Sequence, residues 1–196
     1  MLSALVGNLV RSQLQRLGFY LARTRLSPNA FTVIGLLLNI VVAVIIAGGN
    51  LVVGGIMALV AGGFDMLDGA VARVTGRITR FGGFFDSTLD RYSEAIVYFG
   101  LLIYLLDIEA GTTAIALLFA TIVGSLMVSY TRARAEAANV DAEVGLFARP
   151  ERIILLAILL IFDQPVLALW ILAIVTNLTT MQRIFHVWRQ TRYGEE

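Results

Sequence analysis

The chain has 196 residues, of which 58% are hydrophobic and 15% are charged, and its formal net charge is +1. This composition excludes an ordinary soluble domain and indicates a membrane protein. Because the chain has no cysteine, disulfide bonds, zinc–thiolate sites and thiol nucleophiles are excluded as well.

Residues 1–25 are too polar to cross a membrane. Leucines recur there among polar and basic positions, which predicts an amphipathic helix at the cytoplasmic membrane interface. A plain surface helix packed on the rest of the protein is the alternative. We expect no cleavable signal peptide, because Arg11 and Arg16 interrupt the segment and no apolar stretch with a small-residue cleavage site follows.

Residues 26–196 are predicted to form one domain of six transmembrane helices, so the predicted fold class is an all-α polytopic membrane protein. The apolar stretch at 51–64 is short, but it can continue as a helix through Ala72. Asp163-Gln164-Pro165 divides the last apolar run into a hairpin, since proline ends helices. Five spans, with 153–181 forming fewer helices, is the alternative. The apolar stretches, several of which reach the roughly 20 residues of a span, lie near 30–47, 51–64, 93–106, 112–130, 153–162 and 165–181.

The first span has a clear start. Ser27 can cap the helix and Pro28 suits its first turn. Asn29 and Thr32 lie one turn apart at this end, so we predict that they contact a ligand; capping and bonds between helices are the alternative. Asn39 lies deeper and is predicted to be structural.

The most informative feature is a group of acidic residues between two apolar runs. Four of the seven aspartates of the chain, Asp65, Asp68, Asp86 and Asp90, fall within 26 residues. Carboxylates near a bilayer are costly and mark functional sites. The i,i+3 and i,i+4 spacings place each pair on one face of a helix, and a tight turn over Gly76–Gly83 is predicted to pair the two helices antiparallel. The resulting all-oxygen site suits divalent cations, Mg²⁺ first.

Small and charged residues accompany the aspartates. Arg73 follows Asp68 by five residues and could neutralise a diphosphate. Glu94 continues the Asp86/Asp90 stripe by one turn and is predicted to be a helix partner rather than a further ligand. Glycines at these positions allow close helix packing or let phosphates reach the backbone, the second role being favoured for Gly69 and Gly82. The glycines in question are Gly62, Gly63, Gly69, Gly82 and Gly83.

A long polar stretch separates the fourth and fifth spans. Ser129, Arg132 and Arg134 end the fourth span, Arg152 begins the fifth, and Arg183 lies near the end of the sixth. These side chains are predicted to converge into a pocket for an anionic group, because guanidinium groups bind phosphate bidentately. The alternative, arginines that set topology and face lipid headgroups, is preferred for Arg189 and Arg192.

All 15 basic residues of the chain are arginines. The three connections near Gly48–Asn50, Asp107–Thr112 and Asp163–Pro165 contain none. By the positive-inside rule, both termini and the aspartates are predicted to be cytoplasmic in a multi-pass protein of the cell membrane. Fourteen of the 15 arginines gather before the first span, in the second and fourth connections and after the sixth span: Arg11, Arg16, Arg23, Arg25, Arg73, Arg77, Arg80, Arg132, Arg134, Arg149, Arg152, Arg183, Arg189 and Arg192.

The aspartate motif resembles, position for position, the signature of the CDP-alcohol phosphotransferase family. The motif is Asp65-x2-Asp68-Gly69-x2-Ala72-Arg73-x8-Gly82-x3-Asp86-x3-Asp90. The resemblance implies a six-helix membrane fold, usually homodimeric. It also implies transfer of a phosphatidyl group from CDP-diacylglycerol, or a close lipid analogue, to an alcohol with release of CMP.

The same resemblance implies roles for individual residues. The four aspartates would hold two metal ions, with Mg²⁺ expected and Mn²⁺ an alternative; Asp86 would bridge them and Asp90 would also be the catalytic base. The residues that would bind the CDP-lipid are Gly69, Arg73 and Gly82, with a looser match at Pro28, Asn29 and Thr32.

A second resemblance, to the phosphatidylinositol phosphate synthase branch, concerns the acceptor. It is carried by Ser129-Tyr130-x-Arg132-Ala133-Arg134-Ala135-Glu136, Val144-Gly145, Glu151-Arg152 and Gln182-Arg183. It implies that inositol phosphate is held by Ser129, Arg132, Arg134, Arg152 and Arg183, although Arg132 stands where this branch often has lysine. Glycerol 3-phosphate as acceptor and an ether-linked, archaeal-type CDP-lipid as donor remain open.

A divalent-cation transporter is the competing class. Transporters place such groups near the bilayer midplane, in broken helices or inverted repeats. The aspartates here border a cytoplasmic turn, and the sequence has no visible repeat. An enzyme is therefore favoured, with CDP-lipid, a phosphorylated polyol and membrane lipids as its partners and with no nucleic acid.

Overall fold

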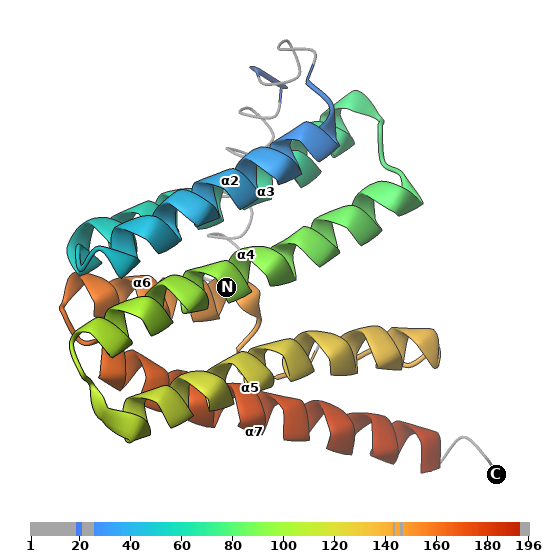
Figure 1. Ribbon diagram of the computed structural model, residues 1–196. Helices are drawn as coiled ribbons and strands as arrows, with labels where there is room; N and C mark the ends of the chain where they lie inside the picture. The colour runs from blue at the N-terminus through green and yellow to red at the C-terminus, as the bar shows by residue number, and fades with distance from the viewer. Residues whose placement is uncertain (1–18, 21–25, 143, 146, 193–196) are drawn as a thin grey trace, which may run out of the picture.

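The computed structural model describes residues 19–20, 26–142, 144–145 and 147–192, and these ranges contain six α-helices (Figure 1). The predicted all-α class is confirmed for this part of the chain. The interfacial helix predicted over 1–25 lies almost wholly outside the described residues. The helices are α2 (Pro28–Ala47), α3 (Leu51–Thr75), α4 (Arg80–Asp107), α5 (Gly111–Ala137), α6 (Arg149–Ile161) and α7 (Pro165–Arg192).

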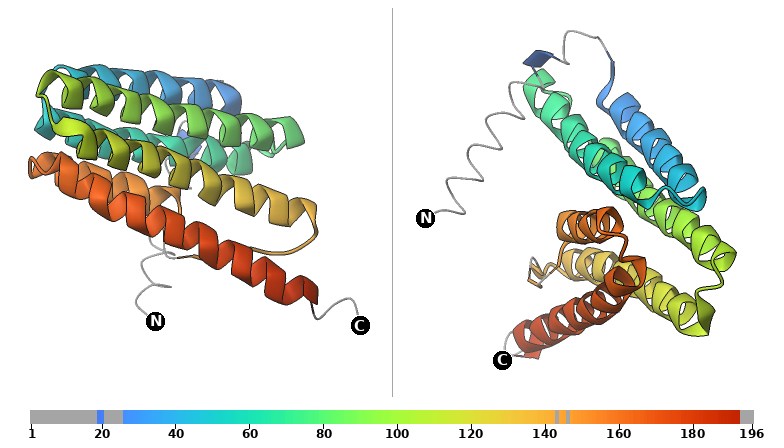
Figure 2. Two further views of the ribbon diagram at one scale, coloured as in Figure 1. Left: turned by 60° about the horizontal axis from the view of Figure 1, so that its bottom comes forward. Right: turned by 90° about the vertical axis from the view of Figure 1, so that its left-hand side faces the viewer.

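The helices run alongside one another in alternating directions (Figure 1). The α2–α3, α4–α5 and α6–α7 connections lie at one end, and the α3–α4 turn lies at the other. α2 packs against α3 and α4, α5 packs against α7, and α6 joins the two groups through α3 and α7. The right-hand view of Figure 2 shows α2 and α3 on one side of the molecule and α5, α6 and α7 on the other.

α3 and α4 run antiparallel as predicted (Figure 1), but they do not pack directly against each other. α2 packs extensively against both helices, whereas α3 and α4 make few contacts with each other. The reason lies in small residues on α2 and α4. A Cβ atom on Gly100 would stand 2.3 Å from the backbone oxygen of Ala43, so only glycine allows α4 to approach α2 this closely. α2 therefore lies against both α3 and α4, where the sequence predicted that these two helices contact each other directly.

The turn between α3 and α4 is shorter than predicted. α3 ends at Thr75, with Gly76 in the left-handed conformation at φ 66°, where glycine is favoured over other residues. α4 already begins at Arg80, and Thr79 caps it by accepting a hydrogen bond from the Gly82 amide at 2.9 Å. Gly82 and Gly83 therefore belong to the first turn of α4. The extension of the 51–64 stretch through Ala72 is confirmed.

Among the described helices, α2, α3, α5 and α7 are long and apolar enough to cross a membrane. α4 has 28 residues, but the stretch from Asp86 to Glu94 carries four charged side chains, those of Asp86, Asp90, Arg91 and Glu94. α6 has 13 residues. At about 1.5 Å per residue it extends about 20 Å, less than a hydrocarbon core of about 30 Å.

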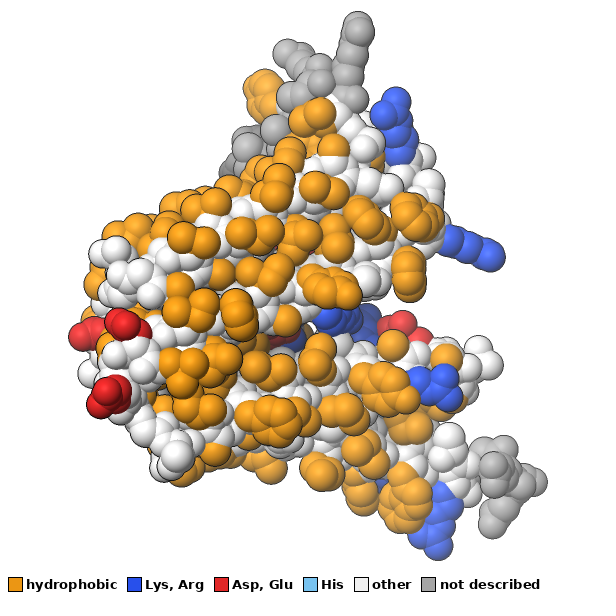
Figure 3. Space-filling view, in the orientation of Figure 1, with side chains coloured by type: hydrophobic (Ala, Val, Ile, Leu, Met, Phe, Trp, Pro, Cys, Tyr) orange, Lys and Arg blue, Asp and Glu red, His pale blue; other side chains and the backbone are white. Residues whose placement is uncertain are grey.

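The core is apolar and the outer surface is apolar too. Leu101, Leu118, Leu160 and Leu169 are fully buried at the centre of one cluster. Hydrophobic side chains also cover most of the face shown in Figure 3. Such a continuous exposed apolar surface exceeds what soluble monomers present and fits contact with lipid.

Candidate active site

The start of α2 is built as the sequence predicts. Ser27 accepts a hydrogen bond from the Ala30 amide at 3.2 Å, and Pro28 occupies the first helical position. One turn later, the Thr32 hydroxyl donates to Asp68 Oδ2 at 2.9 Å. Both side chains are buried, so this bond fixes the N-terminal part of α2 against α3. Thr32 therefore lies at the aspartates.

The four aspartates converge although their helices scarcely pack together. Asp65 lies against α2, where a Cβ atom on Gly35 would stand 2.4 Å from Asp65 Oδ1. Asp68 and Asp86 line one cavity, and the Asp86 carboxyl group lies beside that of Asp68 and within electrostatic range of Asp90. The small side of α2 at Gly35 thus gives the carboxylates of α3 and α4 a common space.

Arg149, the first residue of α6, links the two acidic helices. Its guanidinium bonds Asp65 Oδ2 at 2.6 Å and Asp90 Oδ1 at 2.7 Å. The planar, forked guanidinium suits such a bridge between two carboxylates. Arg149 is not among the residues that the sequence predicts for the site. The available signal was its position at the start of a helix, next to Pro150, after the long polar stretch.

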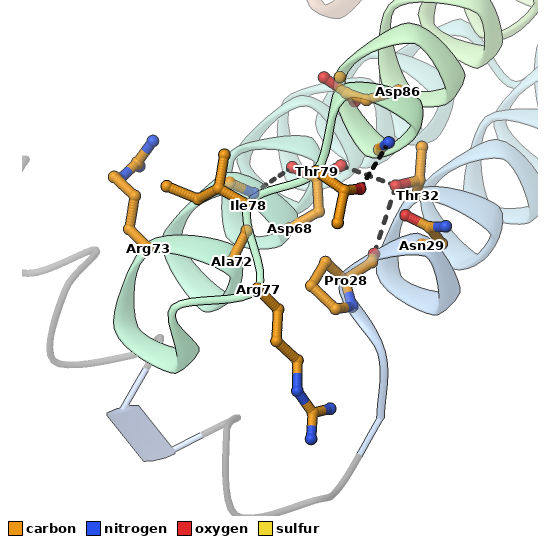
Figure 4. Close-up of a pocket in the computed structure, with 13 residues that line it drawn as sticks. Pro28, Asn29, Thr32, Asp68, Ala72, Arg73, Arg77, Ile78, Thr79 and Asp86 are labelled. Carbon is orange, nitrogen blue, oxygen red and sulfur yellow. Dashed lines mark hydrogen bonds between the residues drawn. The ribbon is translucent and has the colours of Figure 1, made fainter.

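A cavity of about 270 Å³ opens beside Asp68 and Asp86 (Figure 4). Arg77, Ile78 and Thr79, which the sequence analysis did not assign to a site, also line it. In Figure 4, Thr32 and Asp68 point toward each other, whereas Arg73 and Arg77 extend away from them. All six residues predicted to bind the CDP-lipid line this cavity: Pro28, Asn29, Thr32, Gly69, Arg73 and Gly82.

A second cavity, of about 440 Å³, lies on the other side of the aspartates. Figure 3 shows charged side chains in a hollow between α4 and α5. Asp90 and Arg149 line this cavity together with Arg91, which was not predicted. Four of the five residues predicted to bind the acceptor line it as well: Ser129, Arg132, Arg152 and Arg183.

Arg134 is the predicted acceptor residue that the structure does not bring to this cavity. It lies two residues after Arg132 on α5, and positions two apart on a helix point to different faces. Arg134 therefore lies apart from the four residues that this cavity brings together.

The arginines of the second cavity already have protein partners. Arg152 donates to Glu94 through Nε and Nη2, both at 2.7 Å. Arg183 donates to the backbone carbonyls of Val144, at 2.9 Å, and of Val128. Arg132 forms an exposed ion pair with Glu136 on the next turn of α5, at 2.8 Å. These bonds fix where each guanidinium points.

The donor set suits a divalent cation, because the four converging side chains are all carboxylates, the hard oxygen ligands that Mg²⁺ and Mn²⁺ prefer. Within the described part of the chain, however, no three acidic, His or Cys side chains are already arranged around one ion position. Arg149 stands between Asp65 and Asp90. The residues therefore fit a cation by their chemistry, and Arg149 bonds one oxygen of each of two of the four carboxylates.

Comparisons with known proteins agree with this geometry. Residues 25–185 match the family described as CDP-alcohol phosphatidyltransferase. An archaetidylinositol phosphate synthase of Pyrococcus horikoshii is 36% identical over 186 residues, which cover 94% of this chain and 96% of the relative. A phosphatidylinositol phosphate synthase of Mycobacteroides abscessus is 34% identical over 192 residues, which cover 94% of this chain and 84% of the relative.

The fold is similar to that of a solved membrane enzyme. The crystal structure of Mycobacterium tuberculosis phosphatidylinositol phosphate synthase with CDP-DAG bound matches with a TM-score of 0.83 at 30% identity, covering 89% of this chain and 93% of that one. A structure of the same enzyme in complex with manganese and citrate matches with a TM-score of 0.80 at 30% identity, covering 89% of this chain and 88% of that one.

Proposed function

This chain belongs to the CDP-alcohol phosphatidyltransferase family, and we propose that it transfers a phosphatidyl group, or its archaeal ether analogue, from a CDP-lipid to inositol phosphate. The observation that carries the proposal is the placement of two cavities on either side of one acidic group. Asp68 and Asp86 line the first cavity, which contains every predicted CDP-lipid residue. Asp90 lines the second, which contains the arginines.

The first cavity would receive the cytidine diphosphate part of the donor. Gly69 and Gly82 have no side chains there, so a diphosphate can approach the backbone of α3 and α4. Arg73 and Arg77 at the same cavity bring positive charge to the diphosphate. The acyl or isoprenoid chains would lie against the apolar outer surface.

Asp65, Asp68, Asp86 and Asp90 would hold two divalent cations, Mg²⁺ or Mn²⁺. When bound, such ions neutralise the diphosphate and stabilise the leaving CMP. The manganese in the Mycobacterium tuberculosis relative supports this assignment.

Asp90 would act as the general base. It is the aspartate that lines the acceptor cavity, so its carboxylate can take the proton of the acceptor hydroxyl. The oxygen of that hydroxyl then forms a bond to the β-phosphorus of the CDP-lipid, the bond from this phosphorus to CMP breaks, and CMP leaves.

The second cavity favours a phosphorylated acceptor over a neutral alcohol. It combines Arg132, Arg152 and Arg183 with the bridging Arg149. Guanidinium groups bind phosphate through charge-assisted hydrogen bonds. The names of the Mycobacteroides abscessus and Pyrococcus horikoshii relatives support inositol phosphate as the acceptor.

We place the enzyme in the cell membrane as a homodimer, with six spans over 26–196, an interfacial helix over 1–25 and both termini cytoplasmic. Charge asymmetry supports this orientation. Figure 3 shows acidic side chains at the end with the α4–α5 and α6–α7 connections, which contain Asp107, Glu109 and Asp163, and arginines toward the other end. The positive-inside rule makes the arginine-rich end cytoplasmic.

A CMP-release assay with a panel of substrates tests the proposal. Detergent-purified protein with Mg²⁺, CDP-diacylglycerol or CDP-archaeol, and inositol 1-phosphate should release CMP. Release with glycerol 3-phosphate alone would refute the acceptor while the family assignment stands. The preferred lipid in the parallel donor reactions decides between ester-linked and ether-linked chains.

A further inference from the structure

Arg152 and Glu94 form a buried ion pair between α6 and α4. The Arg152 side chain is 1% exposed and that of Glu94 10%. Glu94 accepts two hydrogen bonds, from Nε and from Nη2 of Arg152, both at 2.7 Å. Because the guanidinium is planar, a bidentate bond on one edge fixes the direction in which the remaining nitrogen points.

The remaining nitrogen, Nη1 of Arg152, is buried and has no hydrogen-bond partner among the described residues. Burying a donor without a partner costs folding free energy, so such a group calls for an explanation, and a bound ligand that accepts its hydrogen bond is one. Arg152 lines the acceptor cavity of about 440 Å³. It also lines an adjacent cavity of about 20 Å³, which has room for a water molecule but not for a phosphate group.

Glu94 is itself held by Tyr98 of its own helix, which in turn contacts Ser125 of α5. The Tyr98 hydroxyl lies 3.4 Å from Glu94 Oε1 and also 3.4 Å from the Ser125 hydroxyl of α5. Tyr98 and Ser125 are buried, at 2% and 3% exposure. The carboxylate that orients Arg152 is thus placed by packing and does not depend on the acceptor being bound.

We propose that Glu94 is a positioning residue for the acceptor, acting through Arg152. Glu94 neutralises the buried guanidinium and aims Nη1 at the phosphate of the acceptor. This inference rests on the proposed function, because it requires an anionic group in the arginine-lined cavity. Pre-orientation of Arg152 lowers the cost of ordering this side chain when the acceptor binds.

The first test is the variant Glu94→Gln, assayed by CMP release. The KM for inositol 1-phosphate should rise by about tenfold to a hundredfold, the scale of a charge-assisted hydrogen bond, while the KM for the CDP-lipid stays within about twofold. Glu151→Gln is the matched control, since Glu151 is the neighbour of Arg152, is exposed and undergoes the same change of charge. Equal changes in both KM values for Glu94→Gln would overturn the proposal.

A double-mutant cycle separates positioning from general structural support. In an Arg152→Gln background, adding Glu94→Gln should raise the acceptor KM no further, because Glu94 acts through Arg152. If the two substitutions instead raise the acceptor KM by the product of their separate effects, Glu94 does not act through Arg152. If Glu94→Gln does not fold, Glu94→Asp takes its place, because it keeps the charge but withdraws the carboxylate from Arg152. Glu94→Asp should raise the acceptor KM and not the KM for the CDP-lipid, by less than the rise expected for Glu94→Gln. Unchanged KM values, or equal increases in both, would overturn the proposal.

The failure of this inference is distinguishable from that of the proposed function. Titration calorimetry with inorganic phosphate requires no turnover, and phosphate should bind the wild type more tightly than Glu94→Gln by about tenfold. If the wild type releases no CMP with inositol 1-phosphate, the proposed function fails, and phosphate binding still decides the role of Glu94. Equal phosphate affinities would overturn that role even in an active enzyme.

Discussion

At the scale of single residues, the site depends on a balance of charge between its carboxylates and a neighbouring arginine. Four carboxylates share a small space with the cation of Arg149, which bonds Asp65 through Nη2 and Asp90 through Nη1. Buried charges require such partners, since an isolated charge in an apolar medium is very costly. Substitution of one of these side chains should therefore change one measurable property, such as turnover or metal affinity.

Asp90→Asn separates the base from its neighbours. The asparagine keeps the shape of the side chain but cannot take the acceptor proton, so CMP release should fall by roughly 10²- to 10⁴-fold. Binding of the CDP-lipid, measured on protein in nanodiscs, should be largely retained. Loss of that binding would show instead that Asp90 serves mainly to hold the metal ions.

Arg149→Gln removes the cation that competes with metal ions for Asp65 and Asp90. Mn²⁺, titrated by electron paramagnetic resonance, should bind about tenfold more tightly, because two carboxylates lose a positive neighbour at short range. In EDTA the Tm of the variant should fall, since the carboxylates then repel one another without compensation. Arg189→Gln, the same change of charge at an exposed residue of α7, is the control. Unchanged or weaker Mn²⁺ binding would contradict the arrangement.

At the scale of helices, small residues decide which elements meet. Gly35 gives Asp65 its space on α2, and Gly100 brings α4 onto α2 at Ala43. Elsewhere, Gly124 of α5 approaches Thr176 of α7 just as closely. In a membrane protein, where lipid is as apolar as the helix surfaces, close backbone approach through such residues is a main source of helix association.

Two glycine-to-alanine substitutions test this, one at the α2–α4 contact and one at an open position on α3. Gly100→Ala forces a methyl group against the backbone of Ala43 and should destabilise the protein by about 1–3 kcal/mol, as overpacking does. Gly63→Ala has no atom within 4 Å of its new methyl group and should be neutral or stabilising by up to about 1 kcal/mol. Thermal unfolding in detergent measures both. Similar Tm values for the two variants would contradict the packing role of Gly100.

At the scale of the whole molecule, the two ends of the helix bundle differ in charge. Arginines occupy the end with the α3–α4 turn and the end of α7, while acidic residues occupy the opposite connections (Figure 3). The two substrates of the proposed reaction suit this arrangement. In this arrangement the CDP-lipid would reach the site from the bilayer, and the anionic acceptor would enter from the arginine-rich side.

The absence of cysteine from the sequence makes the orientation directly measurable. In intact cells, a membrane-impermeant maleimide should label Asp107→Cys, at the end of α4, because we place this end outside. Gln190→Cys, near the end of α7, should react after permeabilisation and not before. The reverse pattern would overturn the proposed orientation and place the active site on the outer side.

Much of this protein follows from its sequence because the relevant signals are local. Ser27 and Pro28 start α2 where they were expected to, and the four aspartates mark the site through their spacing on two helices. The six residues predicted to bind the CDP-lipid also lie around one cavity. Caps, apolar length and helical periodicity are encoded within a few residues, so they do not depend on how distant helices pack.

Tertiary structure alone decided how those elements combine. Arg149 meets Asp65 across 84 residues, and Arg152 meets Glu94 across 58. α2 separates α3 from α4, and Arg134 does not reach the cavity that Arg132 lines. The order and rotation of helices set these contacts, and both depend on close approaches such as Gly100 to Ala43, whose partners no local pattern identifies.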